Sequence, residues 1–308
     1  MQTVLITGGA GFIGSYLVDA CIARHYRVLI LDDLSTGKRT HIHKQALLFQ
    51  KDIRWNDIEE IFQAHDIDTV FHLAGQKNVR FSVDNPHIDA DINILGSLNI
   101  LQMCVQYGVR KCIFASTGGV MYGDAKIIPT PESYPPQPIS PYALSKLTAE
   151  HYLDFFRQTH GLQTLSLRFA NVYGPRQDPG GESGVVAIFS QKIIKDEQPV
   201  IYGAGHQTRD YMFVSDAIDA FLLAYDSQYT GCYNVGTGKE TSLLEIIQYL
   251  SRVAGVSITP KHTAGILGDQ LRSALDCTRI QSDLGWKPRV SLEEGIHRTF
   301  SWFLSEVR

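Results

Sequence analysis

The chain has 308 residues, of which 44% are hydrophobic and 19% charged, and its formal net charge is −4. These values are ordinary for a globular protein of about two domains, and the 28 basic and 32 acidic residues are interspersed, which argues against a nucleic-acid-binding protein. The sequence contains no apolar run of about 18 residues, so we predict no membrane span.

The first half of the chain alternates short strands, rich in β-branched residues, with longer helical patterns. The predicted strands are residues 4–7, 27–32, 47–50, 69–75, 111–116 and 164–169. The predicted helices are residues 14–25, 56–65, 86–107 and 140–159. This alternation is typical of an α/β fold with a Rossmann-type, doubly wound parallel sheet that is covered by helices on both faces.

The regular alternation ends after Asn171. Helical patterns recur at 185–196, at 242–255 and over the last fifteen or so residues, whereas 199–216 and 232–238 have strand-and-turn character. We therefore predict a sheet domain over 1–170, to which part of 208–238 returns, and a smaller mixed α/β lobe over 171–308. The lobe is expected to rest on the carboxyl edge of the sheet, where ligands of such sheets bind.

A glycine-rich turn follows the first predicted strand. The segment TGGAGFIGS at 7–15 opens a helix, and its glycines allow a tight turn and a close approach of a pyrophosphate to the helix N-terminus. Asp32, at the end of the second strand, is placed to bind an adenosine ribose and would repel a 2′-phosphate. The sequence therefore predicts a bound dinucleotide and favours NAD, although the nearby Lys38 and Arg39 keep NADP open.

A catalytic pair is predicted from the spacing Tyr-x-x-x-Lys, which places both side chains on one helical face. A lysine beside a phenol favours the phenolate, which could act as a base. The spacing occurs three times, but glycines interrupt the pairs Tyr107/Lys111 and Tyr122/Lys126. Only Tyr142/Lys146 follows a helix start, with Ser140 as a candidate N-cap and Pro141 at the first helical position.

Several motifs together carry a family resemblance. TGGAGFIGS, Asp32, the FAST stretch at 114–117 and SPYALSK resemble the extended short-chain dehydrogenase/reductase family, in particular its nucleotide-sugar branch and, within it, the 4-epimerases. The similarity runs through FHLAGQKNV, NILGSLNIL, RFANVYGPRQ, GAGHQTRDYMFVSD, YNVGTG and SDLGWKP. It implies that Thr117, Tyr142 and Lys146 form the catalytic group, in which Tyr142 is the acid/base on the sugar 4-hydroxyl. Thr117 would share that hydrogen bond, and Lys146 would bind the nicotinamide ribose and lower the pKa of the tyrosine.

The predicted binding residues follow from the glycine turn and from the same resemblance. Those for the NAD cofactor are Gly8, Gly11, Phe12, Ile13, Gly14, Asp32, Asp33, Asp52, Ile53, Ala74, Gly75, Lys77 and Asn93, together with Tyr142 and Lys146. Those for a nucleotide-diphosphate sugar, expected to be UDP-linked, are Thr117, Asn171, Tyr202, Arg209 and Asp269. No metal is assigned, since His41 and His43 have no third ligand close by in the sequence.

Two glycines after Thr117 decide between reactions. In the 4,6-dehydratases that the chain resembles, an Asp-Glu pair at these positions supplies an acid and a base for elimination. Gly118 and Gly119 have no proton to give or take. The resemblance therefore implies epimerisation at carbon 4 of UDP-glucose and UDP-galactose, or of the N-acetylated pair, through a transient 4-keto sugar. Another NAD-dependent nucleotide-sugar reaction (a 5,6-dehydratase, a 4-ketoreductase or a 2- or 5-epimerase) and a non-catalytic dinucleotide-binding sensor stay open.

The chain departs from the family pattern near its C-terminal substrate segment. Ile266 stands where the family usually has a phosphate-binding arginine, and Arg272 is the nearest candidate to replace it. Ser273 falls on the position that gates N-acetylated sugars, and its small size predicts that both sugar types are admitted. The resemblance also implies a homodimer formed through helices at about 86–107 and 140–160. Five widely spaced cysteines and a strand at the very start, without a signal-peptide pattern, indicate a cytoplasmic protein with free thiols.

Overall fold

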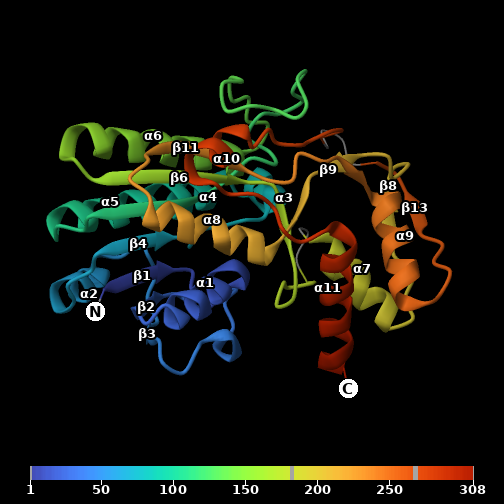
Figure 1. Cartoon of the computed structure of the whole chain (residues 1–308), viewed down its shortest axis with the longest axis horizontal. Helices are drawn as coiled ribbons and strands as arrows, with labels where there is room; N and C mark the ends of the chain where they lie inside the picture. The colour runs from blue at the N-terminus through green and yellow to red at the C-terminus, as the bar shows by residue number, and fades with distance from the viewer. Residues whose placement is uncertain (1, 181–183, 266–269, 308) are drawn as a thin grey trace.

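A parallel sheet of seven strands organises the molecule in the computed structural model, which describes residues 2–180, 184–265 and 270–307 (Figure 1). All six strand pairings in this sheet are parallel. In spatial order the strands are β11 (Gly231–Val235), β6 (Gln163–Phe169), β5 (Lys111–Thr117), β4 (Thr69–His72), β1 (Thr3–Thr7), β2 (Arg27–Leu31) and β3 (Leu47–Phe49). The predicted doubly wound α/β fold is confirmed.

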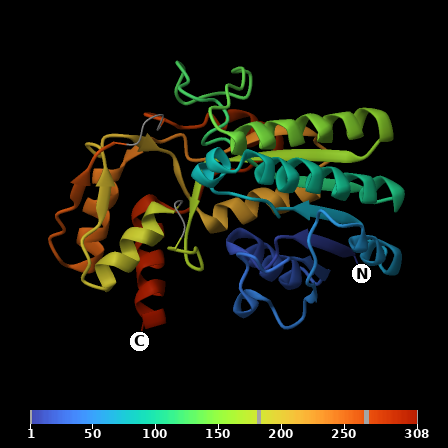
Figure 2. The same cartoon turned by 180° about the vertical axis from the view of Figure 1, so that it is seen from behind.

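Helices cover both faces of this sheet, as the two opposite views show (Figures 1 and 2). One face carries α1 (Phe12–Ala23), α8 (Val214–Asp226) and α10 (Thr278–Leu284). The other carries α2 (Glu59–Ala64), α5 (Gly96–Gln106) and α6 (Pro141–His160). Alternate residues of each strand enter opposite cores: Val4 and Ile6 face α1, whereas Leu5 faces the α2–α5–α6 side. Burial on both faces explains why the strands read as continuous apolar runs.

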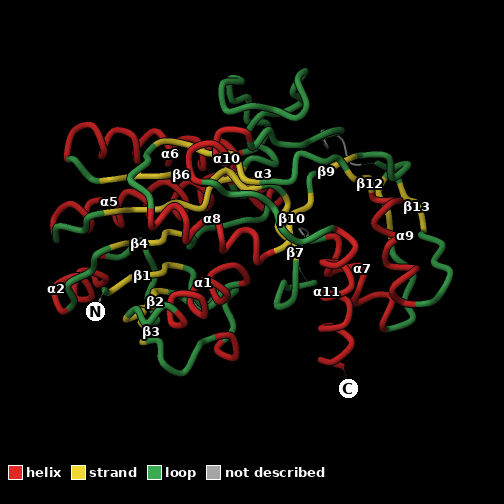
Figure 3. The backbone as a smooth tube through the Cα atoms, viewed as in Figure 1, coloured by secondary structure: helices red, strands yellow, loops and turns green. Residues whose placement is uncertain are grey.

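A second group of elements lies beside the carboxyl edge of the sheet (Figure 3). It contains α7 (Val185–Ile194), α9 (Leu243–Ala254) and α11 (Leu292–Val307), which share one apolar core. Three two-stranded ladders accompany them: β7 (Asn171–Tyr173) with β10 (Tyr211–Phe213), β9 (Thr208–Arg209) with β12 (Thr241–Ser242), and β8 (Val200–Tyr202) with β13 (Lys261–Thr263). The described helices include none that is both long and apolar enough to cross a membrane.

The predicted helix over 86–107 is confirmed as one uninterrupted helical stretch over 86–106, but its middle turn is π-helical. It consists of α4 (Pro86–Ala90), the π-helical turn η3 (Asp91–Leu95) and α5, and it follows the short helix α3 (Val79–Asp84). A π turn shifts the side chains that follow it around the helix axis, and such turns often occur at functional sites. The predicted strand over 69–75 also ends early, at His72: the N–H of Leu73 is shared between the carbonyl and the hydroxyl of Thr7, and that of Ala74 donates to the hydroxyl.

Candidate active site

The glycine-rich turn after β1 is tightly packed. Gly8 has a φ of +71°, a backbone conformation that residues with a side chain rarely adopt. A Cβ at this position would also lie 2.8 Å from the backbone nitrogen of Ala74. A Cβ at Gly14 would lie 2.1 Å from the carbonyl oxygen of Gly8, so only glycine lets α1 approach the turn. Gly11 is the N-cap of α1, whose first residues are Phe12 and Ile13. The first turn of α1 has no acidic residue, which leaves its N–H groups suited to an anion.

Asp32 lies directly after β2 and is almost completely buried. Its carboxylate accepts hydrogen bonds from the N–H groups of Ala10 and Leu34, both at 2.9 Å. Burial raises its pKa, and these two hydrogen bonds oppose that shift. The neighbouring Asp33 is exposed and accepts from the backbone and hydroxyl of Ser35. Asp32 is therefore fixed beside the glycine turn, as a ribose-binding carboxylate would need to be.

The cations that kept NADP open have partners on the protein. Lys38 lies 4.0 Å from Asp178, and Arg39 donates to Gln50. Asp52, another predicted cofactor residue, forms a forked ion pair with Arg54, whose hydrogen bonds lower the pKa of Asp52 against the opposing effect of burial. The adjacent Ile53 is buried.

The remaining predicted cofactor residues converge between β4 and η3. A Cβ at Gly75 would lie 2.6 Å from Asn93 Oδ1 and 3.4 Å from Lys146 Nζ. Because residue 75 is a glycine, no side chain stands between these two polar groups. Asn93 is buried, and its Oδ1 has no hydrogen-bond partner among the described residues. Ala74 directly precedes this glycine, and Lys77, two residues after it, is exposed to solvent. An unpartnered buried oxygen facing a glycine marks a place where a ligand donor fits.

The candidate catalytic group lies where β5 meets α6. Thr117 ends β5, and its side chain is near enough to that of Tyr142 to act on the pKa of the phenol. The predicted helix start is confirmed: the N–H of Ala143 donates to Ser140 Oγ at 3.2 Å, and Pro141 is the first helical residue. One turn later, Lys146 Nζ donates to the carbonyl of Ala115 at 3.1 Å. The other two Tyr-x-x-x-Lys pairs do not lie on continuous helices.

Burial dominates the protonation of this group in the protein alone. It raises the pKa of Tyr142 to about 12, although the hydrogen bond from Thr117 opposes the shift. It lowers the pKa of Lys146 to about 8, against the attraction of Asp89 and Glu150. The lysine does not lower the pKa of the tyrosine in this state, so that expectation stays a prediction for the enzyme with its ligands bound. Tyr142 is a neutral phenol at pH 7 here.

Gly118 and Gly119 differ in the space around them. A Cβ at Gly118 would lie 2.5 Å from Leu275 Cδ1 and 3.0 Å from the carbonyl oxygen of Arg168. A Cβ at Gly119 would meet only Asn171 Oδ1, at 3.2 Å. Because Leu275 is buried, it has little room to retreat. A side chain at the first of the two positions, acidic or not, would therefore require Leu275 to move.

Gly118→Ala is expected to lower the free energy of unfolding by about 1–3 kcal/mol, because the added methyl overpacks the contact with Leu275. The matched control is Gly119→Ala, whose methyl faces a side-chain amide on an exposed residue and should cost much less. Urea denaturation of the two variants measures the difference. Equal stabilities would show that Leu275 does not restrict this position.

Three of the predicted substrate residues lie on the short strands β7, β8 and β9. Asn171 is exposed at the start of β7, Tyr202 is half-exposed at the end of β8, and Arg209 ends β9 with its guanidinium donating to the Thr208 carbonyl. Asp269 and Ile266 lie outside the described residues. The candidate replacement for a phosphate-binding arginine is otherwise engaged: Arg272 is paired with Glu240 at 2.9 Å.

Ser273 lies next to the candidate catalytic group. It is buried, and its hydroxyl donates to the carbonyl of Gly119 at 3.1 Å. Since Gly119 also faces Asn171, these three residues share one wall of the site. A small side chain at this point keeps the wall open.

Two buried carboxylates that organise the site are absent from the sequence-based prediction. Asp89 of α4 accepts from Gln76, Asn93 and Ser145 at 2.6–3.0 Å. It thereby connects α6, the helix that carries the candidate catalytic residues, to the cofactor residues. Asp210, next to Arg209, accepts from Thr237, Gly238 and Leu275. Within helical or strand patterns an acidic residue indicates a solvent-facing position, so the pattern gave no signal for either.

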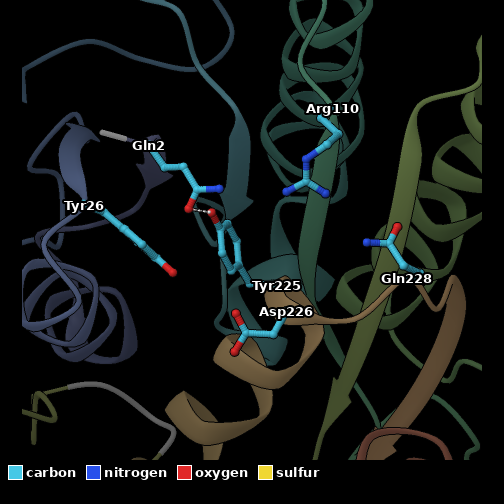
Figure 4. A pocket seen from close by; sticks show the side chains of 6 residues that line it. All are labelled: Gln2, Tyr26, Arg110, Tyr225, Asp226 and Gln228. Carbon is cyan, nitrogen blue, oxygen red and sulfur yellow. Dashed lines mark hydrogen bonds between the residues drawn. The ribbon is translucent and has the colours of Figure 1, made fainter.

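A separate polar cleft of about 400 Å³ lies at the amino end of the sheet (Figure 4). Its charged side chains are already paired, Arg110 with Asp68 and Asp226 with Arg24, and Tyr225 donates to Gln2. None of the predicted site residues lines it. The candidate site is therefore the carboxyl edge described above.

The fold and the turn after β1 define a dinucleotide-binding α/β protein. The chain belongs to the NAD dependent epimerase/dehydratase family, whose model matches residues 4–236. It is 44% identical to the UDP-glucose 4-epimerase of Thermotoga maritima, solved with UDP-glucose, with a TM-score of 0.98 over 100% of both chains. It is 42% identical to the UDP-glucose 4-epimerase of Thermus thermophilus in complex with NAD (TM-score 0.93; 98% of this chain, 99% of that one).

A third solved structure binds an N-acetylated sugar. It is the UDP-N-acetylglucosamine 4-epimerase of Methanobrevibacter ruminantium in complex with UDP-N-acetylmuramic acid. The identity is 35% and the TM-score 0.94, over 99% of both chains. Similarity to all three extends over both the sheet and the smaller group of elements at its edge.

Proposed function

We propose that this protein is an NAD-dependent 4-epimerase of UDP-hexoses that interconverts UDP-glucose and UDP-galactose and also accepts the N-acetylated pair. The observation that carries the proposal is that Thr117 and Tyr142 adjoin each other one helical turn from Lys146, next to a position where a side chain would clash with Leu275. The site has a group for proton transfer at one carbon, and Gly118 and Gly119 supply neither the acid nor the base that an elimination would need in addition. The three similar enzymes support the same reaction.

The cofactor fits the residues around the glycine turn. A pyrophosphate would contact the N-terminus of α1, where Gly8 and Gly14 leave no room for side chains. Asp32 would accept from the adenosine ribose, and Asn93 Oδ1 would find the hydrogen-bond donor that it lacks. Bound NAD would supply the hydride acceptor and donor for carbon 4 of the sugar. The cofactor residues Asp33, Asp52, Ile53 and Lys77 would complete the adenosine and ribose contacts.

The catalytic group would handle the proton of the sugar 4-hydroxyl. With the ligands bound, Tyr142 would act as the phenolate: it would take this proton as carbon 4 is oxidised and return it as the 4-keto sugar is reduced, while Thr117 shares the hydrogen bond. Lys146, whose Nζ would lie 3.4 Å from a Cβ at Gly75, would donate to the nicotinamide ribose. Because burial lowers its pKa to about 8, this lysine keeps its charge at neutral pH but gains from a nearby acceptor.

The smaller group of elements would hold the nucleotide sugar. Arg209 provides a fork of donors that matches phosphate oxygens, and Tyr202 offers a half-exposed ring for the base. Asn171 and Asp269 are the further proposed contacts. Ser273, buried beside Gly119, leaves room for an acetamido group at carbon 2. We accordingly assign the dinucleotide to residues 1–170, with part of 208–238, and the sugar nucleotide to 171–308.

Proton NMR of purified protein mixed with UDP-glucose, UDP-galactose or UDP-N-acetylglucosamine, without added cofactor, tests this function. The carbon-4 epimer should appear in all three mixtures, and the fastest sugar identifies the preferred substrate. A new alkene or keto signal would favour the dehydratase or reductase alternatives. Retained NAD without any product would favour a dinucleotide-binding sensor.

We propose that the protein is a homodimer formed through the helices at 86–107 and 140–160. Large apolar side chains are half-exposed on them, including Leu95 (56%), Leu144 (54%) and Phe155 (52%). Helices α4, η3 and α5 lie against α6, so these side chains belong to one layer of the molecule (Figure 2). Multi-angle light scattering should give twice the chain mass, and a monomer at micromolar concentration would contradict the proposal.

We propose a cytoplasmic location on the basis of the cysteines. All five are free thiols, and four of them are buried. Free buried thiols are typical of proteins that function in a reducing compartment. Subcellular fractionation tests this, and recovery with an extracellular or periplasmic fraction would contradict it.

A further inference from the structure

A buried histidine connects the segments that converge on the cofactor site. His72 is the last residue of β4 and is completely buried. Its Nδ1 lies 2.7 Å from Thr7 Oγ1, and its Nε2 lies 2.9 Å from Ser97 Oγ. Thr7 directly precedes Gly8 of the glycine turn, and Ser97 lies four residues after Asn93. Both ring nitrogens are therefore engaged by hydroxyl groups from cofactor-binding segments.

The directions of these hydrogen bonds follow from their neighbours. Ser97 Oγ lies 2.6 Å from the backbone carbonyl of Asn93, which can only accept, so the serine donates its single hydrogen there. It must then accept from His72, which places the imidazole proton on Nε2. The backbone N–H groups of Leu73 and Ala74 both donate to Thr7 Oγ1, at 3.1 and 3.0 Å. The hydroxyl hydrogen of Thr7 is thus left for Nδ1.

We propose that His72, as the neutral Nε2–H tautomer, is a positioning residue that fixes the cofactor site and thereby slows the loss of NAD. The proposal rests on the proposed function only in that NAD is the ligand. One continuous chain of hydrogen bonds runs from the N–H groups of Leu73 and Ala74 through Thr7, His72 and Ser97 to the carbonyl of Asn93.

The chain joins three separate segments through one ring. It holds the turn after β1, the segment after β4 that leads to Gly75, and η3 with the unpartnered Oδ1 of Asn93. A proton on Nδ1 would point at the hydroxyl hydrogen of Thr7, and without a proton on Nε2 the hydroxyl of Ser97 would lose its donor. Burial lowers the pKa of His72 to about 3, with a smaller contribution from the charge of Lys146, which agrees with a ring that stays neutral.

The tautomer can be observed directly by ¹⁵N–¹H correlation NMR of the histidine side chains in the holoenzyme, with a His72→Gln sample for assignment. The expected spectrum shows a protonated Nε2 and an unprotonated Nδ1 that do not change between pH 6 and about 8. A proton on Nδ1, or a ring that titrates in this range, would overturn the assignment.

The link to the cofactor is tested with Thr7→Val, Thr7→Ser and a control, Thr164→Val. The control removes another buried strand threonine, whose hydroxyl donates to the Leu153 carbonyl away from the site. Thr7→Val leaves Nδ1 and the N–H of Ala74 without their partner, while Leu73 keeps its hydrogen bond to the Thr7 carbonyl, so NAD should leave the holoenzyme about tenfold faster. Thr7→Ser keeps the hydroxyl and should restore slow release.

Release of NAD from Thr7→Val at the rate of Thr164→Val would overturn the proposal, as would a Thr7→Ser variant that behaves like Thr7→Val. If Thr7→Val does not fold, Ser97→Ala, which removes the acceptor at Nε2, is measured in its place with the same expectation. Neither readout requires turnover. A protein that retains NAD in this pattern but epimerises no sugar would therefore contradict the proposed reaction and leave the role of His72 supported.

Discussion

Turnover of UDP-galactose by a Tyr142→Phe variant is expected to fall by about 10²–10⁴-fold, the usual contribution of one acid–base group. The phenol lies beside Thr117 and one helical turn from Lys146. Phenylalanine keeps the ring and its packing but cannot carry the proton. NAD should remain on the protein, since the glycine turn and Asp32 are untouched.

The matched control is Tyr107→Phe, at another Tyr-x-x-x-Lys spacing. Tyr107 lies at the end of α5 and donates to Glu59 at 2.6 Å, and Lys111 lies in β5 with its amine on the carbonyls of Ala224 and Tyr225. This variant should retain its turnover. Activity of Tyr142→Phe within a few-fold of the unchanged protein would show that proton transfer uses another group, whatever the spacing predicts.

The parts of the site that the sequence predicts are those built from neighbours in the chain. The turn over 7–15 can be recognised because strand, glycines and helix follow one another, and each glycine has a local steric reason. The start of α6 is equally local: Ser140 caps it and Pro141 fits its first turn. These two short segments fix the positions of the proposed pyrophosphate and of Tyr142.

The parts that sequence reasoning missed depend on contacts between distant segments. Leu275 fills the space next to Gly118 from more than 150 positions away, so two adjacent glycines that look alike in the sequence differ in what they tolerate. Asp89 reads as a surface residue of a helix, yet it is buried under α6. The π-helical turn η3 has no proline or glycine signal inside Asp91–Leu95. Only the packed fold reveals these features.

A buried ion pair between α6 and β6 also depends on contacts between distant segments. Of the changes considered, removal of one partner of this pair should cause the largest loss of stability. Glu150 of α6 accepts from Arg168 Nε at 3.0 Å and from Ser116 Oγ at 2.5 Å, and both charged side chains are at most 7% exposed. Although burial alone would lower the pKa of the guanidinium, Glu150 raises it, so the arginine stays charged. Arg168 also donates to Tyr122.

Glu150→Ala is expected to lower the free energy of unfolding by about 3–5 kcal/mol, because it leaves the charge of Arg168 buried without its partner. The matched control, Asp154→Ala, breaks an exposed pair with Arg157 on the same helix and should cost about 1 kcal/mol or less. Denaturation in urea compares the two variants. The double variant Glu150→Ala/Arg168→Ala should lose less than the sum of its single changes, since no lone charge remains. Equal losses in Glu150→Ala and Asp154→Ala would show that water reaches Arg168 and that the pair does not fix α6 on the sheet.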